Sequence, residues 1–214
     1  MDIAGVFASA LARNPDALAL VDGAVRRSYA EWDRDIRSIA GGLSARGLGR
    51  GDRLVCVMPN GFEMATLYWA CQMLGAVFTP FNWRAAGDEI AYALSDADPR
   101  IVAVDEKAVA LPKFSSKRLI TLRDRAGGPS FGELLQSEPA AGAASLDDQD
   151  ICLMLYTSGT TGRPKGVPRS VRAERSAAAS VLAHLRYRFG ERVLGAMPMF
   201  HTMGIRNMLC SAMV

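Results

Sequence analysis

Residues 52–80 read DRLVCVMPNGFEMATLYWACQMLGAVFTP, and the order of elements expected within them decides the fold class. Residues 52–58 form a compact apolar run that is typical of a buried strand. Residues 60–75 predict a helix that opens with a capping box of Asn60 and Glu63 and ends at Gly75. Residues 77–80 are again extended and apolar. This order of strand, helix and strand favours a crossover unit with parallel strands.

The same alternation continues on both sides of this stretch. Before it, Ser28 and Glu31 predict a capping box that opens a helix ending at Gly47. The further expected elements are a helix at 87–95, strands at 100–105, 117–122 and 151–156, a short helix opened by Ser130, and a helix capped by Ser170. The sequence therefore predicts an α/β fold with a mostly parallel sheet flanked by helices.

Length and composition limit the classes of function. The chain has 214 residues, of which 50% are hydrophobic and 22% are charged, as in ordinary soluble globular proteins. Its net charge of +3 is too small to argue for a nucleic-acid partner. Residues 137–150 are small, polar and acidic, which indicates a surface linker and not a domain boundary, because a core strand follows at once.

Cysteines and apolar runs indicate a cytoplasmic protein. The four cysteines, Cys56, Cys71, Cys152 and Cys210, lie far apart in apolar runs, so we expect buried, reduced thiols and no metal site. Residues 64–83 carry no formal charge, but Gly75 divides them, which favours a buried helix and strand over a transmembrane span. The N-terminus lacks the basic region of a secretion signal.

A segment rich in glycine and hydroxyl groups follows the strand expected at residues 151–156. Residues 156–166 read YTSGTTGRPKG. Glycines allow backbone N–H groups to approach a ligand closely, hydroxyl groups donate hydrogen bonds, and cations attract anions. The glycines are Gly159, Gly162 and Gly166. The hydroxyl groups belong to Thr157, Ser158, Thr160 and Thr161, and the cations are Lys165 and Arg163. Together they predict a phosphate-binding loop; the alternative is a mobile polar surface loop.

The spacing excludes the two commonest phosphate motifs. A Walker A loop has four residues between its glycines and a helix that starts at its lysine. Here two residues separate Gly159 from Gly162, and Pro168 would lie in the first turn of a helix beginning at Lys165. The Gly-x-Gly-x-x-Gly fingerprint of dinucleotide-binding proteins is also absent from the sequence.

Residues 156–167 resemble the phosphate-binding signature of the adenylate-forming (ANL) superfamily, which includes acyl-CoA synthetases, peptide-synthetase adenylation domains and luciferases. Residues 28–32, 51–55, 58–60, 75–77 and 81–84 resemble successive blocks of that family in the same order. The resemblance covers essentially the whole chain, so residues 1–214 are expected to form an N-terminal part of an AMP-binding domain of the acyl-CoA synthetase fold. Asn82, Trp83 and Arg84 favour a fatty-acid or aromatic acyl-CoA ligase.

The resemblance implies a reaction and its residues. The family uses ATP to convert a carboxylic acid to an acyl-adenylate and passes the acyl group to a thiol such as that of CoA. By position, the residues expected to bind the β- and γ-phosphates are Thr157, Ser158, Gly159, Thr160, Thr161, Gly162 and Lys165, with Lys165 also catalytic. Residues 197–204 resemble the next family motif, which assigns His201 to the acyl carboxylate; a helix-capping or partly buried His201 is the alternative.

Members of this family are more than twice as long, and the resemblance places the remaining motifs outside these 214 residues. These motifs include the magnesium ligand, the adenine and ribose blocks and a small C-terminal domain, so no metal ligand is expected in the chain. The expected partners are a carboxylic acid, ATP, Mg²⁺ and CoA. Two hypotheses remain: the N-terminal part of a ligase that acts only as a longer protein, or a truncated, non-catalytic remnant that binds nucleotide phosphates weakly or serves as an interaction module.

Overall fold

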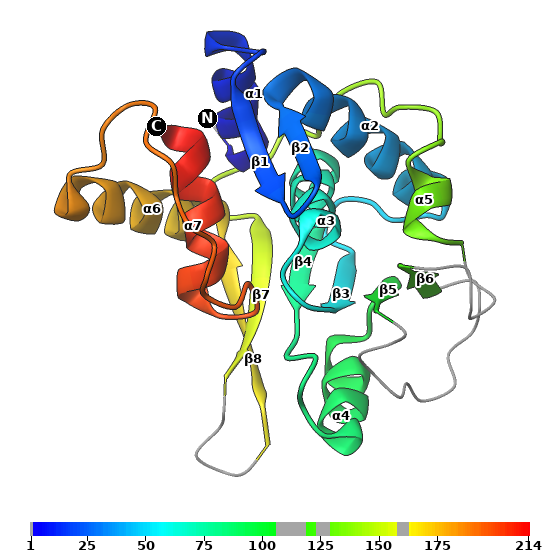
Figure 1. The fold of residues 1–214 in the computed structure, drawn as a ribbon. Helices are drawn as coiled ribbons and strands as arrows, with labels where there is room; N and C mark the ends of the chain where they lie inside the picture. The colour runs from blue at the N-terminus through cyan, green and yellow to red at the C-terminus, as the bar shows by residue number, and fades with distance from the viewer. Residues whose placement is uncertain (1, 106–118, 123–128, 158–162) are drawn as a thin grey trace.

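The computed structural model describes residues 2–105, 119–122, 129–157 and 163–214 (Figure 1). In this part of the chain, a six-stranded sheet has the order β6-β5-β3-β4-β7-β8, and β1 and β2 form a separate pair. The elements are α1 (Ile3–Arg13), β1 (Leu18–Asp22), β2 (Val25–Ser28), α2 (Tyr29–Ala45), β3 (Arg53–Val57), α3 (Phe62–Leu74), β4 (Val77–Pro80), α4 (Gly87–Ala97), β5 (Ile101–Val104), β6 (Leu119–Thr121), α5 (Phe131–Leu134), β7 (Ile151–Thr157), β8 (Lys165–Ser170), α6 (Val171–Leu185) and α7 (Thr202–Met213).

The central sheet is mostly parallel. β3 pairs in parallel with β4 and with β5, β4 pairs in parallel with β7, and β5 pairs in parallel with β6. β8 returns antiparallel to β7, with Thr157 opposite Lys165. The α/β fold with a mostly parallel sheet flanked by helices, expected from the sequence, is confirmed, and no helix starts at Lys165.

Both faces of the sheet are covered, which explains the continuous apolar runs. Leu54 and Cys56 of β3 point into the core formed with α1, α2 and α3. Val55 and Val57 point into a second core, which α4 covers. Because side chains alternate along a strand, a strand covered on both faces needs apolar residues at every position. In Figure 1, α2 and α3 lie above the strands and α4 lies below them.

Several local predictions hold and one is wrong. Ser28 and Ser130 form the expected capping boxes, Ser170 caps α6, and Gly75 ends α3 with a φ of 69°. The expected cap at Asn60 is wrong: Gly61 occupies the cap position of α3, without a side-chain hydrogen bond. The Phe62 N–H donates instead to a carboxylate oxygen of Asp22 at 2.9 Å, which leaves the Asn60 side chain for other contacts.

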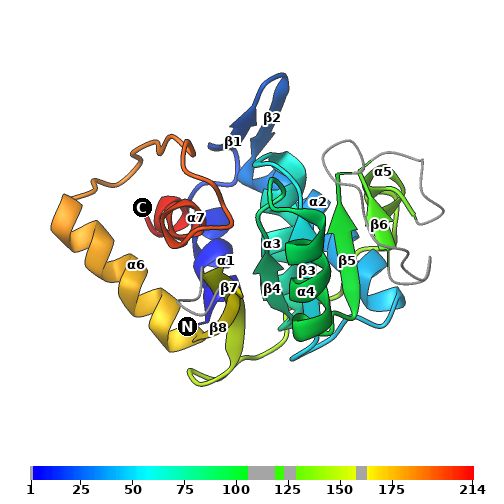
Figure 2. The same cartoon turned by 90° about the horizontal axis from the view of Figure 1, so that it is seen from below.

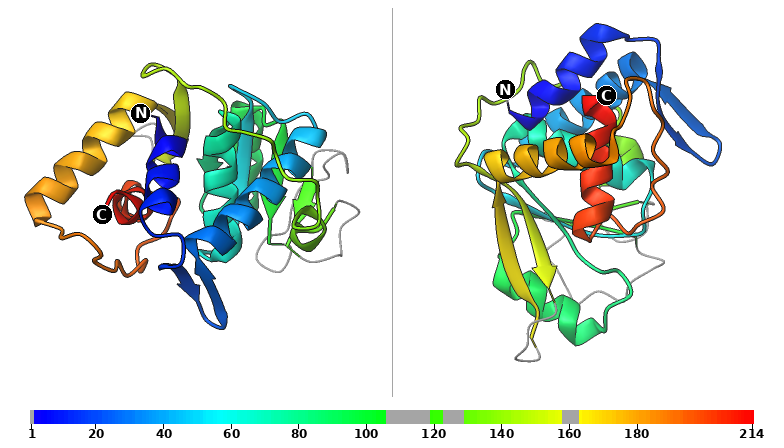
Figure 3. Two further views of the ribbon diagram at one scale, coloured as in Figure 1. Left: turned by 90° about the horizontal axis from the view of Figure 1, so that it is seen from above. Right: turned by 90° about the vertical axis from the view of Figure 1, so that its left-hand side faces the viewer.

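Three N-terminal elements, α1, β1 and β2, were not predicted. Helix α1 is capped by Asp2 and buries Ile3, Val6, Phe7 and Ala10 along one face. The β1–β2 hairpin projects from the body of the protein, and α1 packs beside α7 (Figure 3). The spacing of the buried residues in α1 is that of an amphipathic helix.

Helix α3 is buried almost all round, as the uncharged residues 64–83 led us to expect. Among the residues that the structure describes, no helix is long and apolar enough to cross a membrane. The four cysteines are buried and free, in agreement with the sequence prediction.

One buried carboxylate joins three elements. Glu174 of α6 is 4% exposed, and its Oε1 atom accepts a hydrogen bond from Nε of Arg169, in β8, at 2.6 Å. A guanidinium nitrogen of Arg206, in α7, lies 3.9 Å from the same oxygen. Figure 2 shows α6 and α7 together on one side of the β7–β8 pair. Glu174 therefore links the strand that begins at Lys165 to the helix that follows His201.

Helix α4 supports the end of β7. The Tyr156 hydroxyl donates to a carboxylate oxygen of Asp96 at 2.7 Å, and its ring meets Phe81 edge-on with 5.4 Å between the centroids. Burial raises the pKa of Tyr156 well above its usual value, and the hydrogen bond to Asp96 adds to the effect. The phenol therefore stays neutral at physiological pH and holds β7 against α4.

We expect Glu174→Ala to lower the free energy of unfolding by roughly 3 kcal/mol, because it leaves two guanidinium groups without their shared carboxylate. Asp148→Ala is the matched control: Asp148 is 50% exposed and pairs with Arg175 at 2.9 Å. An exposed pair of this kind contributes about 0–1 kcal/mol. Urea denaturation measures both changes, and equal losses would contradict a structural role for the Glu174 junction.

Tyr156→Phe tests the contact between α4 and β7 through its pH dependence. The raised pKa favours the neutral phenol in the folded state, so this contribution is complete below the usual pKa of about 10 and is lost as pH rises through the folded-state pKa. The wild type should therefore keep its full stability advantage over Tyr156→Phe below about pH 10 and lose it progressively as the pH rises further. Thermal unfolding across this range measures the difference, and a constant difference would contradict the assignment. Tyr29 and Tyr68, whose pKa values are also raised, are common to both proteins.

Candidate functional site

A cavity of about 350 Å³ lies where the carboxyl ends of β4 and β7 meet. Its lining residues come from the segment after β4, from α4, from the β7–β8 hairpin and from the start of α7: Pro80, Phe81, Asn82, Ala85, Glu89, Tyr156, Thr157, Pro164, Phe200 and His201. In parallel sheets, ligands bind in the crevice outside the carboxyl ends of the strands. The position and lining of this cavity make it the candidate site.

The β7–β8 hairpin brings both ends of the predicted phosphate loop to the cavity. Thr157, the last residue of β7, is exposed and lines it, as does Pro164. Lys165 follows directly, is exposed and stands opposite Thr157 in the ladder. The other predicted phosphate ligands, Ser158, Gly159, Thr160, Thr161 and Gly162, lie outside the described residues. A hydroxyl group and an ammonium group thus stand at the base of the segment 158–162.

His201 reaches the same cavity from a different direction. It is the cap residue of α7, yet its side chain makes no capping hydrogen bond, and the residue is exposed. His201 therefore occupies the cap position of α7 without capping the helix through its side chain, and it is not buried. The Phe200 ring packs beside the imidazole, with 4.5 Å between the ring centroids. His201 is thus left with its ring at the cavity wall and open to solvent.

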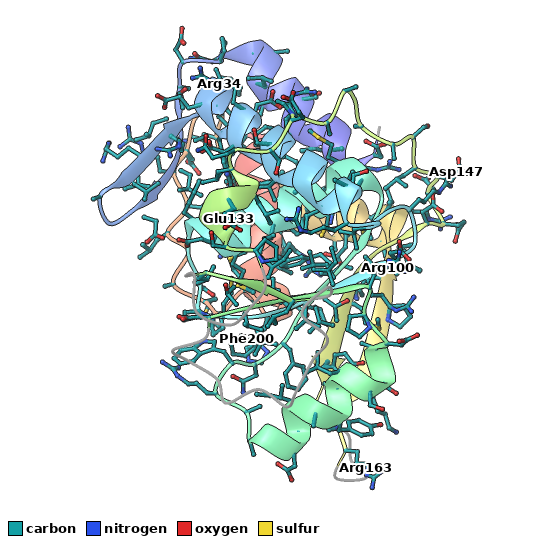
Figure 4. The ribbon with its side chains drawn as sticks, turned by 90° about the vertical axis from the view of Figure 1, so that its right-hand side faces the viewer. Arg34, Arg100, Glu133, Asp147, Arg163 and Phe200 are labelled. Atoms are coloured by element: carbon teal, nitrogen blue, oxygen red, sulfur yellow. The ribbon has the colours of Figure 1, made fainter. Side chains whose placement is uncertain are left out.

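Arg163 points to α4. Its guanidinium group lies over the Tyr92 ring, 5.4 Å from the centroid. In Figure 4, Arg163 is labelled beside α4 at the lower end of the molecule, and Phe200 lies nearer its middle. Together with Asp88 and Glu89 of α4, Arg163 and Pro164 line a second hollow next to the cavity. This arrangement places the Arg163 charge on the outer side of the hairpin, near two carboxylates.

Five polar or aromatic residues of the cavity were not predicted as site residues, and three of them, Phe81, Asn82 and Glu89, lie outside both predicted motifs. Phe81 and Asn82 follow β4, and Glu89 lies in the first turn of α4, where it also accepts a hydrogen bond from the Ala86 N–H. The position of Asn82 directly after a buried parallel strand could have indicated the site, because such strand ends share one edge of the sheet. Glu89 carries the pattern of a helix start, which hides any second role.

The described part of the chain contains no group of three or more His, Cys, Asp or Glu residues that could hold a metal ion. Glu89 is the carboxylate that lines the cavity. The lining also offers the Tyr156 and Thr157 hydroxyl groups, the Asn82 amide, the His201 imidazole and an aromatic wall, and the exposed Lys165 follows Pro164 of the lining. Such a set suits an anionic ligand with an apolar portion.

Comparisons with known proteins give the family. Residues 7–214 match the family described as AMP-binding enzyme. FadD13, a long-chain-fatty-acid–CoA ligase of Mycobacterium tuberculosis, is 34% identical over 195 residues, which make up 88% of this chain and 38% of FadD13. Feruloyl-CoA synthase of an Amycolatopsis species is 34% identical over 200 residues, which make up 92% of this chain and 39% of the synthase.

The fold is shared over nearly the whole chain. The inhibitor-bound crystal structure of the N-terminal domain of FACL13 from Mycobacterium tuberculosis superposes with a TM-score of 0.86 and 30% identity, over 99% of this chain and 55% of that one. The chain spans less than half the length of the curated relatives named above and matches their N-terminal part. The relatives named above are acyl-CoA ligases, and with its sheet and these matches the chain belongs to the family of AMP-binding enzymes.

Proposed function

We propose that this chain forms the N-terminal part of an ATP-dependent, AMP-forming acid–CoA ligase that acts on a fatty or aromatic carboxylic acid. The observation that carries the proposal is the single cavity lined by Thr157 and Pro164, from the two ends of the predicted phosphate loop, and by His201, from the second family motif. The relatives include a long-chain-fatty-acid–CoA ligase and a feruloyl-CoA synthase, which supports both acid classes.

The hairpin end of the cavity would bind the phosphates of ATP. When a carboxylate oxygen of the acid attacks the α-phosphorus, the bond to the β-phosphate oxygen breaks and pyrophosphate leaves with its negative charge. Hydroxyl donors and a cation stabilise this charge best when they are held in place before the reaction. The β7–β8 ladder fixes the backbones of Thr157 and Lys165 opposite each other at the end of the hairpin, which places both side chains near the cavity.

The α7 end of the cavity would face the acid. An imidazole at the wall can donate a hydrogen bond to the carboxylate and orient the attacking oxygen. His201 is free to do so, since its side chain does not cap α7. The Phe200 and Phe81 rings give this end an apolar wall. In the second half-reaction, the CoA sulfur would attack the acyl carbonyl, and AMP would leave.

The ligases of this family use Mg²⁺ with ATP and CoA. Magnesium prefers carboxylate, phosphate and water oxygens. We propose that it enters with the ATP phosphates and that its protein ligand lies outside the described residues.

Calorimetric titration with pyrophosphate and with magnesium–ATP tests the phosphate part of the proposal. We expect both to bind the wild-type chain, and we expect Lys165→Ala to weaken pyrophosphate binding roughly tenfold, the loss of one charge-assisted contact. Backbone N–H groups also bind phosphate oxygens, so the affinity for pyrophosphate should fall but not disappear.

Arg34→Ala is the matched control, because it removes an exposed cation from α2, at the end of the molecule opposite to Arg163 in Figure 4. It should leave the affinity within about twofold of wild type, because exposed charges beyond about 10 Å are screened. The proposal would be contradicted if neither pyrophosphate nor ATP bound the chain, or if both variants weakened pyrophosphate binding equally.

A further inference from the structure

Asn60, between β3 and α3, binds a segment that lies far along the chain. Its side-chain Nδ2 donates to the Met197 carbonyl at 2.8 Å and to the Gly195 carbonyl at 3.3 Å. Its Oδ1 accepts a hydrogen bond from the Met199 N–H at 2.8 Å. Both the donor and the acceptor of the Asn60 amide therefore form hydrogen bonds with the backbone of residues 195–199. Ala65, one turn into α3, packs in the same core as Met199.

The segment that Asn60 binds is irregular and largely exposed before Met199. Residues 191–198 belong to no helix or strand. Leu194 is 85% exposed and Met197 is 46% exposed, whereas Met199 is buried. A backbone without secondary structure needs partners for its N–H and C=O groups, and side chains can supply them. Asn60 supplies three such bonds across five residues.

The position of this segment determines the position of His201. The His201 N–H donates to the Pro198 carbonyl at 3.0 Å. Gly204, in the first turn of α7, packs so closely on that carbonyl that a Cβ atom on it would lie 2.1 Å from the Pro198 oxygen. Residues 197–199 and the start of α7 therefore move together. Any shift of the Pro198 peptide carries the Phe200 and His201 rings with it.

We propose that Asn60 is a positioning residue that holds His201 at the wall of the cavity. The inference rests on the proposed function for the importance of His201, but the placement itself is a property of the folded chain. Asn60 does not line the cavity, so its effect passes through the backbone of residues 197–199. A residue that served stability alone would leave the His201 environment in the folded protein unchanged.

The chain has two histidines, His184 and His201, so imidazole NMR signals report this placement directly. His184 lies in the last turn of α6 and serves as the internal reference. At a fixed pH and without ligand, Asn60→Ala should shift or broaden the His201 ring signals and leave those of His184 in place. Asn60→Asp keeps the side-chain size and the acceptor for Met199 but removes both donors, so it should displace His201 as well and is the second variant if Asn60→Ala fails to fold.

Asn14→Ala is the matched control, because it makes the same chemical change at an exposed residue directly after α1, outside the lining of the cavity. It should leave the His201 signals at their wild-type positions. Wild-type His201 signals in folded Asn60→Ala or Asn60→Asp would overturn the inference, and so would an equal displacement in Asn14→Ala.

A further titration separates this inference from the proposed function. Magnesium–ATP added to the wild type should shift the His201 signals if the cavity binds ATP, and the shift should shrink in Asn60→Ala. If ATP leaves the wild-type signals unchanged while Asn60→Ala displaces them, the proposed function fails and the positioning role of Asn60 stands.

Discussion

β4 and β7 pair in parallel through Phe78 and Leu153, and the candidate site depends on this pairing. The pair joins the β7–β8 hairpin to the crossover unit β3–α3–β4, and both strands end at the same edge of the sheet. Gln72 of α3 reinforces the junction by donating a buried hydrogen bond to the Cys152 carbonyl at 3.2 Å. Without this register, Thr157 would not lie beside Phe81 and Asn82, and these three residues would not line one cavity.

The β7–β8 hairpin and the start of α7, which line the cavity from two directions, are held by different contacts. The hairpin is held by α4 through Tyr156 and Asp96, and by α6 through Arg169 and Glu174. The start of α7 is held by the side chain of Asn60, through hydrogen bonds to the backbone of an irregular segment. Glu174 also approaches Arg206 of α7, so the two halves meet again at one buried carboxylate. A displacement of the β7–β8 hairpin or of the start of α7 would therefore reach the other through the contacts of Glu174.

The sequence predicts most of this fold, because its signals are local. The apolar run of β3 and the glycine at the end of α3 depend on neighbouring residues only, and both were predicted. The role of Asn60 was misassigned because its partners lie 135 to 139 residues away, where no spacing rule applies. The burial of α1 likewise depends on α2, α3 and α7. Asn82 and Glu89 join the cavity only because the sheet brings their elements together.

The proposed function requires one ligand that contacts both the β7–β8 hairpin and His201. A crystal structure of the chain with a non-hydrolysable acyl-adenylate analogue tests it most directly. We predict electron density in the cavity, with the phosphate group near Thr157 and Lys165 and the acyl carbonyl facing His201. An analogue bound instead in the groove between β1 and α7, with neither Thr157 nor His201 in contact, would contradict the account.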